Sequence, residues 1–291
     1  MYRGVQAAAA ASAGGLAQGY RLVQNSMDVE FAQLTDVGRV RQGNEDCFGY
    51  VTPTTPEETR GRGWLFAVAD GVGGHDFGEV ASHTAIESVL AGFRDAVPGE
   101  PQAALLKRLV QNANTRVLDV GHSTGPGGTH MATTIVACAL RYDRVAVAHV
   151  GDSRGYLIRR VQAVLLTRDH TIANEQVKLN LLSKEEAAES ETRHMLSRSL
   201  GSELSVSVEI NEHQVSPGDV LLLCSDGLHG AVEASEMAAI TSRGGDLAAA
   251  ARKLVDIANH RDGSDNISLQ LIRVRSVERM GMYRGRPYRL P

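Results

Sequence analysis

The stretch Thr133-Thr-Ile-Val-Ala-Cys-Ala-Leu-Arg-Tyr-Asp-Arg-Val-Ala-Val-Ala-His-Val150 decides the fold class. It contains two runs that are apolar at nearly every position, separated by the tight link Tyr142-Asp143. Continuous apolar runs of this kind predict strands that are covered on both faces. A tight link favours strands that lie side by side and antiparallel. We therefore expect a buried antiparallel sheet.

Further short apolar runs occur on both sides of this hairpin. They cover residues 30–34, 64–69, 156–159, 163–166, 206–210, 220–224 and 267–274. Helix spacing recurs in two early segments, at Ile86, Leu90, Phe93 and Val97 and at Ala103, Leu106, Val110, Ala113 and Val117. Two later helices are expected at residues 234–241 and 246–260. The tight link Ser216-Pro-Gly-Asp219 favours a second pair of antiparallel neighbours.

The order of these segments excludes a doubly wound sheet. Strands come first, then two helices, a run of strands, a polar helical insert near residues 171–199, more strands, two helices and a last strand. A doubly wound sheet would alternate strand and helix regularly. We therefore predict the α+β class, with two antiparallel sheets packed together and paired helices on their outer faces.

Composition describes an ordinary globular chain of 291 residues with a formal net charge of -4. Such a balance gives no reason to expect nucleic acid as a partner. No apolar stretch approaches the roughly 18 residues that span a bilayer, so no membrane segment is expected. The three cysteines have no CxxC spacing, which indicates a reducing compartment. The expected location is the cytoplasm.

We expect three parts along the chain. Residues 1–27 are rich in Ala and Gly and predict a flexible leader. Residues 28–275 form the folded domain. Residues 276–291 form a basic tail, which is typical of a solvated segment.

Acidic residues abut the ends of the expected strands at five places. These are Asn44-Glu-Asp46, Asp70-Gly-Val-Gly-Gly74, Gly151-Asp-Ser-Arg154, Ser225-Asp-Gly227 and Asp265-Asn266. Any one Asp-Gly pair is typical of a turn. Five together predict a cluster at one edge of the two sheets, where carboxylates 4 Å apart would repel by roughly 4 kcal/mol per pair. Such a cluster needs cations.

The chemistry of these ligands favours hard ions. Carboxylates and backbone carbonyls, without a Cys or His set, prefer Mg²⁺ or Mn²⁺ over Zn²⁺. Two such ions that share a carboxylate lower the pKa of a bridging water and present hydroxide to an electrophile. Arg41, four residues before Glu45, would lie at the same edge, where its planar fork suits a phosphate. The alternative for Arg41 is an ordinary surface arginine.

Taken together, these segments resemble the PP2C (PPM) family of metal-dependent serine/threonine protein phosphatases in its bacterial form. The resemblance covers about residues 31–274. It is carried by Thr35-Asp-Val-Gly-Arg-Val-Arg-Gln-Gly-Asn-Glu-Asp46, Val68-Ala-Asp-Gly-Val-Gly-Gly-His-Asp-Phe-Gly-Glu-Val-Ala-Ser82, Met131-Ala-Thr-Thr134, His149-Val-Gly-Asp-Ser-Arg-Gly-Tyr156, Leu223-Cys-Ser-Asp-Gly-Leu228 and Ser264-Asp-Asn266. The family fold is a four-layer αββα sandwich.

The resemblance implies a role for each acidic residue. Asp70 would bridge two ions of Mn²⁺ or Mg²⁺. The remaining roles are Glu45 and the Gly71 carbonyl on one ion, Asp226 and Asp265 on the other, Asp152 with Asp226 on a weaker third ion, and Asp46 in support behind the ligands. Arg41 would bind the substrate phosphate. Residues 168–200 would form the flap, a variable segment that the family uses for substrate selection.

The implied activity is hydrolysis of phosphoserine and phosphothreonine in proteins by a metal-bridging hydroxide, without a covalent phosphoenzyme. The expected partners are phosphorylated proteins, including a bacterial Ser/Thr kinase and its substrates, and the expected state is a monomer. One departure from the family concerns the general acid, because Val72 stands where animal members carry a histidine. His75 is close in sequence. A second departure is Ala132, which replaces the usual glycine.

Two other functions stay open. Gly151-Asp-Ser-Arg-Gly155 matches the nucleophile elbow of an α/β-hydrolase, with Asp226 and His260 following in triad order. The elbow requires a helix after the serine, whereas a strand is expected here, and this esterase would need Ser153. The second alternative is a non-catalytic phosphoprotein-binding regulator of the same fold. Such a protein would be expected to have lost metal carboxylates, which this chain retains.

Overall fold

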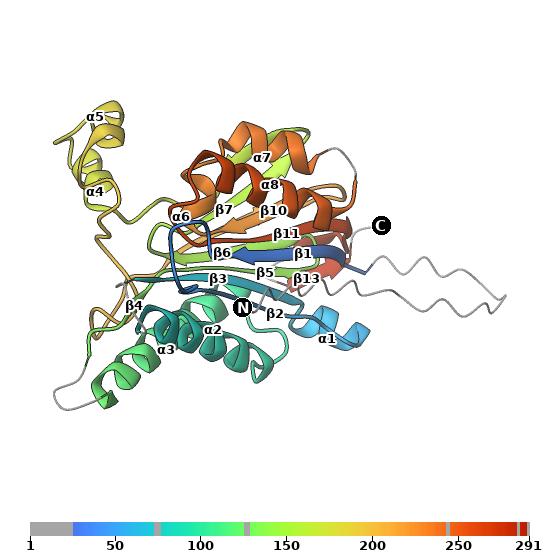
Figure 1. The fold of residues 1–291 in the computed structure, drawn as a ribbon. Helices are drawn as coiled ribbons and strands as arrows, with labels where there is room; N and C mark the ends of the chain where they lie inside the picture. Colours follow the sequence, from blue (N-terminus) through green and yellow to red (C-terminus); the bar gives the residue numbers. More distant parts are fainter. Residues whose placement is uncertain (1–25, 73–76, 125–128, 243–244, 284–285, 290–291) are drawn as a thin grey trace.

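The computed structural model describes residues 26–72, 77–124, 129–242, 245–283 and 286–289. Two antiparallel sheets lie face to face, and helices cover the outer face of each (Figure 1). The predicted α+β class and the αββα sandwich are confirmed. Most of the expected leader, residues 1–25, lies outside the described residues.

Each sheet combines strands from distant parts of the chain. The first sheet has the order β2 (Asp46–Val51), β3 (Trp64–Val72), β5 (Ile135–Arg141), β6 (Arg144–Val150) and β9 (Glu209–Gln214), with β4 (Ala132–Thr133) paired to β3. The second has the order β1 (Asp28–Asp36), β11 (Ile267–Ser276), β10 (Val220–Cys224), β7 (Arg154–Arg159) and β8 (Gln162–Leu165). The chain therefore passes between the sheets several times.

The hairpin that decided the fold class forms as predicted. β5 and β6 pair in continuous register from Ile135 opposite Val150 to Arg141 opposite Arg144. Tyr142 adopts a φ of 62° in the link between them. Residues 135–140 and 145–150 are buried, because the strands are covered on both faces.

The expectation that the link Ser216–Asp219 joins antiparallel neighbours was wrong. This link leads from β9, which pairs with β6, to β10, which pairs with β7 and β11 in the other sheet. A short link restricts how far the chain travels, and the facing sheet lies within that reach. The strand expected at residues 206–210 begins only at Glu209. Val206 and Val208 precede β9 and pack in the core beneath the helices.

Helices cover both outer faces. α2 (Phe77–Arg94) and α3 (Gln102–Ser123) cover the first sheet, and α6 (Asp226–His229), α7 (Ala234–Thr241) and α8 (Leu247–Arg261) cover the second (Figure 1). α2 ends before Val97, which is 71% exposed. Its assignment to a helical face from spacing alone was therefore wrong.

The side chains of β3 show how a strand serves two cores. Leu65, Ala67 and Ala69 pack against α2 and α3, whereas Phe66 and Val68 point into the space between the sheets. This alternation follows from the two-residue period of a strand. Phe31 of β1 meets Phe66 with ring centroids 5.1 Å apart, which joins the two sheets at this level.

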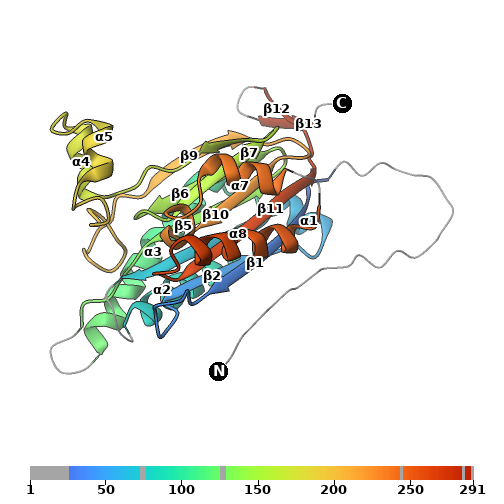
Figure 2. The same ribbon diagram turned by 45° about the horizontal axis from the view of Figure 1, so that its top comes forward.

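Two segments extend beyond the sandwich. The insert carries α4 (Ile172–Lys178) and α5 (Lys184–Glu189), which project from the end of the sandwich where β4 lies (Figure 1). After β11, β12 (Met280–Tyr283) and β13 (Arg286–Arg289) form a two-stranded sheet at the other end (Figure 2). The helix α1 (Pro56–Gly61) lies near it, and Arg60 forms an ion pair with Glu278. Among the described residues, no helix has the length and apolar character to cross a membrane.

Candidate metal and phosphate site

The predicted acidic residues lie where strands of both sheets end. Asp46 begins β2 and is in register with Asp70 near the end of β3. Asp226 begins α6 one residue after β10, and Asp265 lies just before β11. Burial and the charges of neighbouring carboxylates raise the pKa of Asp70 well above its usual range. The neighbours that act on Asp70 are Asp46, Asp226, Asp152 and Asp265.

Asp46 lies behind the other carboxylates and is 6% exposed. Its Oδ2 accepts a hydrogen bond of 2.8 Å from the hydroxyl of Ser225, which belongs to the second sheet's side of the site. Its Oδ1 is buried without a hydrogen-bond partner. Burial raises the pKa of Asp46 to about 7, and the charges of Asp226 and Asp265 act in the same direction.

The backbone of Asp70 is held by two threonines. The hydroxyl of Thr133 and the N–H of Thr134 each donate to the carbonyl of Asp70 at 2.8 Å. The N–H of Asp70 donates to Oγ1 of Thr134 at 3.0 Å. These bonds fix the end of β3, so the direction of the Asp70 side chain is set before any ligand arrives.

Glycines allow the close approach of three backbone segments at this edge. A Cβ at Gly71 would lie 2.2 Å from the carbonyl oxygen of Gly78 and 2.8 Å from that of Glu45. A Cβ at Gly78 would lie 2.8 Å from Oε2 of Glu45. The N–H of Gly71 donates to the carbonyl of Glu45 at 3.1 Å. Any larger residue would therefore displace Glu45.

Asn266 ties the loop that carries Arg41 and Glu45 to the start of β11. Its Oδ1 accepts from the N–H of Glu45 at 2.8 Å, and its Nδ2 donates to the carbonyls of Val37 and Gly43 at 2.9 and 3.0 Å. Asn266 is 4% exposed. One buried amide therefore sets the shape of this loop through three bonds.

The guanidinium of Arg41 lies among the acids. Its Nη2 donates to Oδ2 of Asp265 at 2.8 Å. This hydrogen bond, together with the charges of Asp265, Glu45 and Asp70, raises the pKa of Arg41. The side chain is 43% exposed, so the group is reachable from solvent while being held at the acidic edge.

Asp152 lies in the turn between β6 and β7 and is 7% exposed. Burial raises its pKa to about 7, with further contributions from the charges of Asp226 and Asp169. Its carbonyl accepts a hydrogen bond of 3.0 Å from Nε2 of His229. The structure thus brings Asp152 close enough to Asp226 for their charges to interact.

The structure argues against an esterase that uses Ser153. Ser153 is 1% exposed, its hydroxyl shares a hydrogen bond of 2.7 Å with Thr134, and the strand β7 follows it. A nucleophile elbow needs an exposed serine before a helix. Val72 is 38% exposed near the site, and His75 lies outside the described residues.

The donor set fits divalent cations. Asp226 and Asp46 each have one buried carboxylate oxygen without a hydrogen-bond partner. Like charges crowd together, and the guanidinium of Arg41 lies among them. A set of several carboxylate oxygens suits Mg²⁺ or Mn²⁺, and bound cations would neutralise the negative charge of the carboxylates.

The model of the family described as protein phosphatase 2C matches residues 53–268. The chain belongs to the protein phosphatase 2C family. Its sequence is 34% identical over 263 residues to the serine/threonine phosphatase stp of Listeria innocua, which covers 89% of this chain and 99% of that protein. This protein phosphatase 2C relative therefore matches over nearly its whole length.

Solved structures give the same family. The serine/threonine phosphatase PstP/Ppp of Mycobacterium tuberculosis superposes with a TM-score of 0.73 at 30% identity, covering 85% of this chain and 99% of that one. The catalytic domain of the serine threonine protein phosphatase PstP, solved with two manganese ions, superposes with a TM-score of 0.70 at 30% identity, covering 86% and 100%. The protein phosphatase 2C fold is therefore shared across these proteins.

Sequence reasoning missed the residues that hold the acidic cluster in shape. Ser225, Thr134 and Asn266 all lie inside the motifs that carried the resemblance, but none was given a role. For Ser225 and Asn266 the available signal was their position beside an acidic residue near a strand end, whereas Thr134 has no acidic neighbour in the sequence. Their partners are far away in sequence, so the bonds themselves were not predictable.

Proposed function

We propose that this protein is a metal-dependent phosphatase that hydrolyses phosphoserine and phosphothreonine in proteins. The observation that carries the proposal is the convergence of Asp70, Asp226 and Asp265 from the two sheets, with Arg41 bonded at the same edge. Membership of the protein phosphatase 2C family supports it.

We assign the metal ligands from this arrangement and the family motifs. Asp70 would be shared by two ions of Mn²⁺ or Mg²⁺. The other assignments are Glu45 and the Gly71 carbonyl for one ion, Asp226 and Asp265 for the other, and Asp152 with Asp226 for a weaker third. Cations of this kind, when bound, lower the pKa of a water so that a nucleophile exists at neutral pH.

The residues of the chain bind and orient the substrate. The planar guanidinium of Arg41 suits two oxygens of a phosphate. Its bond to Asp265 holds it beside the carboxylates, so a phosphate on Arg41 would sit at the same edge. Asp46 accepts the Ser225 hydroxyl and would hold the surrounding groups in place.

The remaining assignments concern partners and place. The flap, residues 168–200, projects beside this end of the sandwich and would contact the protein around the phosphorylated residue. We expect phosphorylated proteins as substrates, among them a bacterial Ser/Thr kinase and its targets, and a cytoplasmic monomer.

Hydrolysis of p-nitrophenyl phosphate and of a phosphothreonine peptide tests the proposal. We expect turnover with Mn²⁺ or Mg²⁺, none with EDTA, and loss on Asp70→Asn. Ser153→Ala serves as the control and should retain activity, because the Ser153 hydroxyl is buried and hydrogen-bonded to Thr134. Activity that survives EDTA would contradict the proposal, as would the absence of turnover with every metal.

The non-catalytic regulator makes a different prediction in the same assay. In that case Mn²⁺ would tighten binding of the phosphothreonine peptide without releasing phosphate. Fluorescence anisotropy of a labelled peptide beside a phosphate-release assay separates the two functions.

A further inference from the structure

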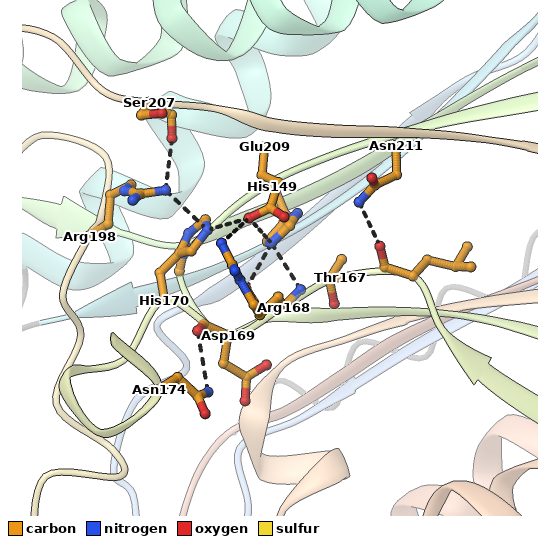
Figure 3. Close-up of polar contacts among 12 residues, drawn as sticks. His149, Thr167, Arg168, Asp169, His170, Asn174, Arg198, Ser207, Glu209 and Asn211 are labelled. Carbon is orange, nitrogen blue, oxygen red and sulfur yellow. Dashed lines mark hydrogen bonds and ion pairs between the residues drawn. The ribbon is translucent and has the colours of Figure 1, made fainter. Parts of the chain in front are cut away.

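Two buried histidines lie together where the flap leaves the sandwich. His149 at the end of β6 and His170 at the start of the flap stack with ring centroids 4.7 Å apart and 12° between the planes (Figure 3). Both rings are 0% exposed. Nε2 of His170 lies 3.1 Å from Oε2 of Glu209, and the same carboxylate oxygen lies 3.9 Å from Nε2 of His149. The three side chains resemble a metal-binding group.

The ring nitrogens of both histidines have protein partners in this arrangement. The N–H of Gly151 donates to Nδ1 of His170 at 3.1 Å. Burial, with the adjacent His149 and Arg198, lowers the pKa of His170 to about 4, so the ring is neutral, and Nη1 of Arg198 lies 3.1 Å from its Nε2. Nε2 of His149 is engaged by the backbone of Arg168, whose carbonyl oxygen lies at 2.9 Å and whose N lies at 3.1 Å. Each Nε2 therefore already has a protein partner besides Glu209.

The bonds of His170 to Gly151 point to a different role. Besides the side-chain bond, the N–H of His170 donates to the carbonyl of Gly151 at 3.0 Å. One residue of the flap stem therefore engages both backbone groups of Gly151. The next residue is Asp152, whose carboxylate faces Asp226.

The two residues before His170 also bond to residues near Asp152. We call residues 168–170 the flap stem and residues 151–153 the Asp152 turn. Asp169 accepts two hydrogen bonds from Arg154, at 2.9 and 2.7 Å. Arg168 engages His149 through its backbone. Each residue of the flap stem thus binds a residue that lies in or beside the Asp152 turn.

The flap stem is also continuous with the rest of the flap. The N–H of Ser197 donates to the carbonyl of His170 at 2.8 Å, and Thr171 and Leu196 form a β-bridge. The two ends of the flap are therefore joined at His170. A displacement of the flap stem would act first on Gly151 and, through it, on Asp152.

We propose that His170 is a positioning residue for Asp152, acting through the hydrogen bond from the Gly151 N–H to its Nδ1. The flap stem and the Asp152 turn then move as one unit. The metal part of this inference rests on the proposed function, whereas the hydrogen bond to Gly151 does not.

A pair of variants separates the two nitrogens of the ring. In His170→Asn, the side-chain oxygen can occupy the place of Nδ1 and accept from Gly151, but contact with Glu209 is lost. In His170→Gln, the longer side chain can donate to Glu209 in place of Nε2, but Gly151 loses its acceptor. Glu209→Ala is the matched control, because it removes one partner of Nε2 and leaves Gly151 bonded.

Hydrogen exchange of the Gly151 amide is the first measurement, on full-length protein labelled with [¹⁵N]glycine in EDTA. We expect His170→Gln to speed exchange by about tenfold, the loss of one hydrogen bond. His170→Asn and Glu209→Ala should stay near wild type. Equal exchange in His170→Gln and His170→Asn would overturn the proposal.

Titration with Mn²⁺, followed by electron paramagnetic resonance, is the second measurement. We expect His170→Gln to weaken the weakest Mn²⁺ site several-fold while the tighter sites keep their affinity. Unchanged Mn²⁺ affinity beside faster Gly151 exchange would overturn the link to Asp152. If no variant and no wild type binds Mn²⁺, the proposed function fails while the exchange result still decides the hydrogen bond.

Folding of the variants is checked by thermal unfolding. If His170→Gln does not fold, His170→Asn decides alone. It retains the acceptor for Gly151, so it must keep both the slow exchange and the Mn²⁺ affinity, and loss of either contradicts the proposal.

Discussion

Ser225 donates a hydrogen bond of 2.8 Å to Asp46 across the two sheets. Ser225 follows β10 of the second sheet, and Asp46 begins β2 of the first. The same hydroxyl accepts the N–H of Ser268 at 3.0 Å. One small side chain therefore fixes a carboxylate of one sheet to the backbone of the other, directly behind the acidic cluster.

Asp70→Asn should stabilise the protein in EDTA while removing its response to metal. Burial and the charges of neighbouring carboxylates raise the pKa of Asp70, so a neutral amide of the same size lowers the cost of burial and relieves repulsion in the metal-free state. In Mn²⁺ the wild type should gain stability and the variant much less, and hydrolysis should fall on the order of a hundredfold or more. Thermal unfolding with EDTA and with Mn²⁺ measures both effects. Asp119→Asn, an exposed acid of α3, is the control and should change neither.

Asp152 should make metal-free stability fall as the pH rises. Its pKa is raised from 3.8 to about 7 in the folded state, so between these values the folded protein holds a proton that the unfolded chain has released. Its contribution is full below about pH 4 and is lost as the pH rises through about 7. Buried histidines such as His170 impose the opposite trend, because their folded pKa is lowered. The test therefore compares wild type with Asp152→Asn, whose histidines are unchanged.

The expected result of that comparison is a difference that depends on pH. In EDTA, Asp152→Asn should be more stable than wild type at pH 8, and this advantage should shrink toward pH 5. Urea unfolding at the two pH values measures it. A constant difference at both values would show that Asp152 is not protonated in the folded protein near pH 5.

Gly71→Ala should damage the site by sterics alone. The added Cβ would lie 2.2 Å from the carbonyl oxygen of Gly78, a backbone atom that moves only with its segment. We expect a loss of about 2 kcal/mol or more in unfolding free energy and weaker Mn²⁺ binding. Gly43→Ala is the matched control, because its Cβ would meet nothing within 4 Å. Similar urea unfolding and calorimetric Mn²⁺ titration for the two variants would refute the steric account.

Asn266→Ala should loosen the loop that carries Arg41 and Glu45. The substitution removes the partner of three backbone groups, each worth about 1 kcal/mol. We expect the unfolding free energy to fall by about 2–4 kcal/mol and the KM for p-nitrophenyl phosphate to rise, because Arg41 is no longer held. Unfolding and steady-state kinetics measure this. Asn266→Asp tests the chemistry, since its oxygen can still accept from Glu45 but cannot donate to Val37 and Gly43.

The strands and the acidic cluster were predictable from sequence because their signals are local. An apolar run such as residues 145–150 indicates a buried strand wherever it pairs. A carboxylate at a strand end, such as Asp70 or Asp265, lies at a sheet edge whatever the strand order. Two packed sheets then bring such edges together.

The remaining features depend on which distant segments meet. The sequence showed that the link Ser216–Asp219 is short. It did not show that the strands on either side of this link belong to different sheets. Val97 fits a helical spacing although α2 ends three residues earlier. The bond between His170 and Gly151 requires the flap stem to return to the Asp152 turn, and no local pattern reports that return.

The division of the ligands between the two sheets has a consequence for the folding of the chain. Asp46 and Asp70 belong to one layer, and Asp226 and Asp265 to the other. No fragment that contains a single layer can assemble the acidic cluster. Any partial unfolding that separates the two layers disrupts the whole cluster. The proposed metal centre would therefore exist only in chains whose two sheets have packed together, so an incompletely folded copy would carry no active centre.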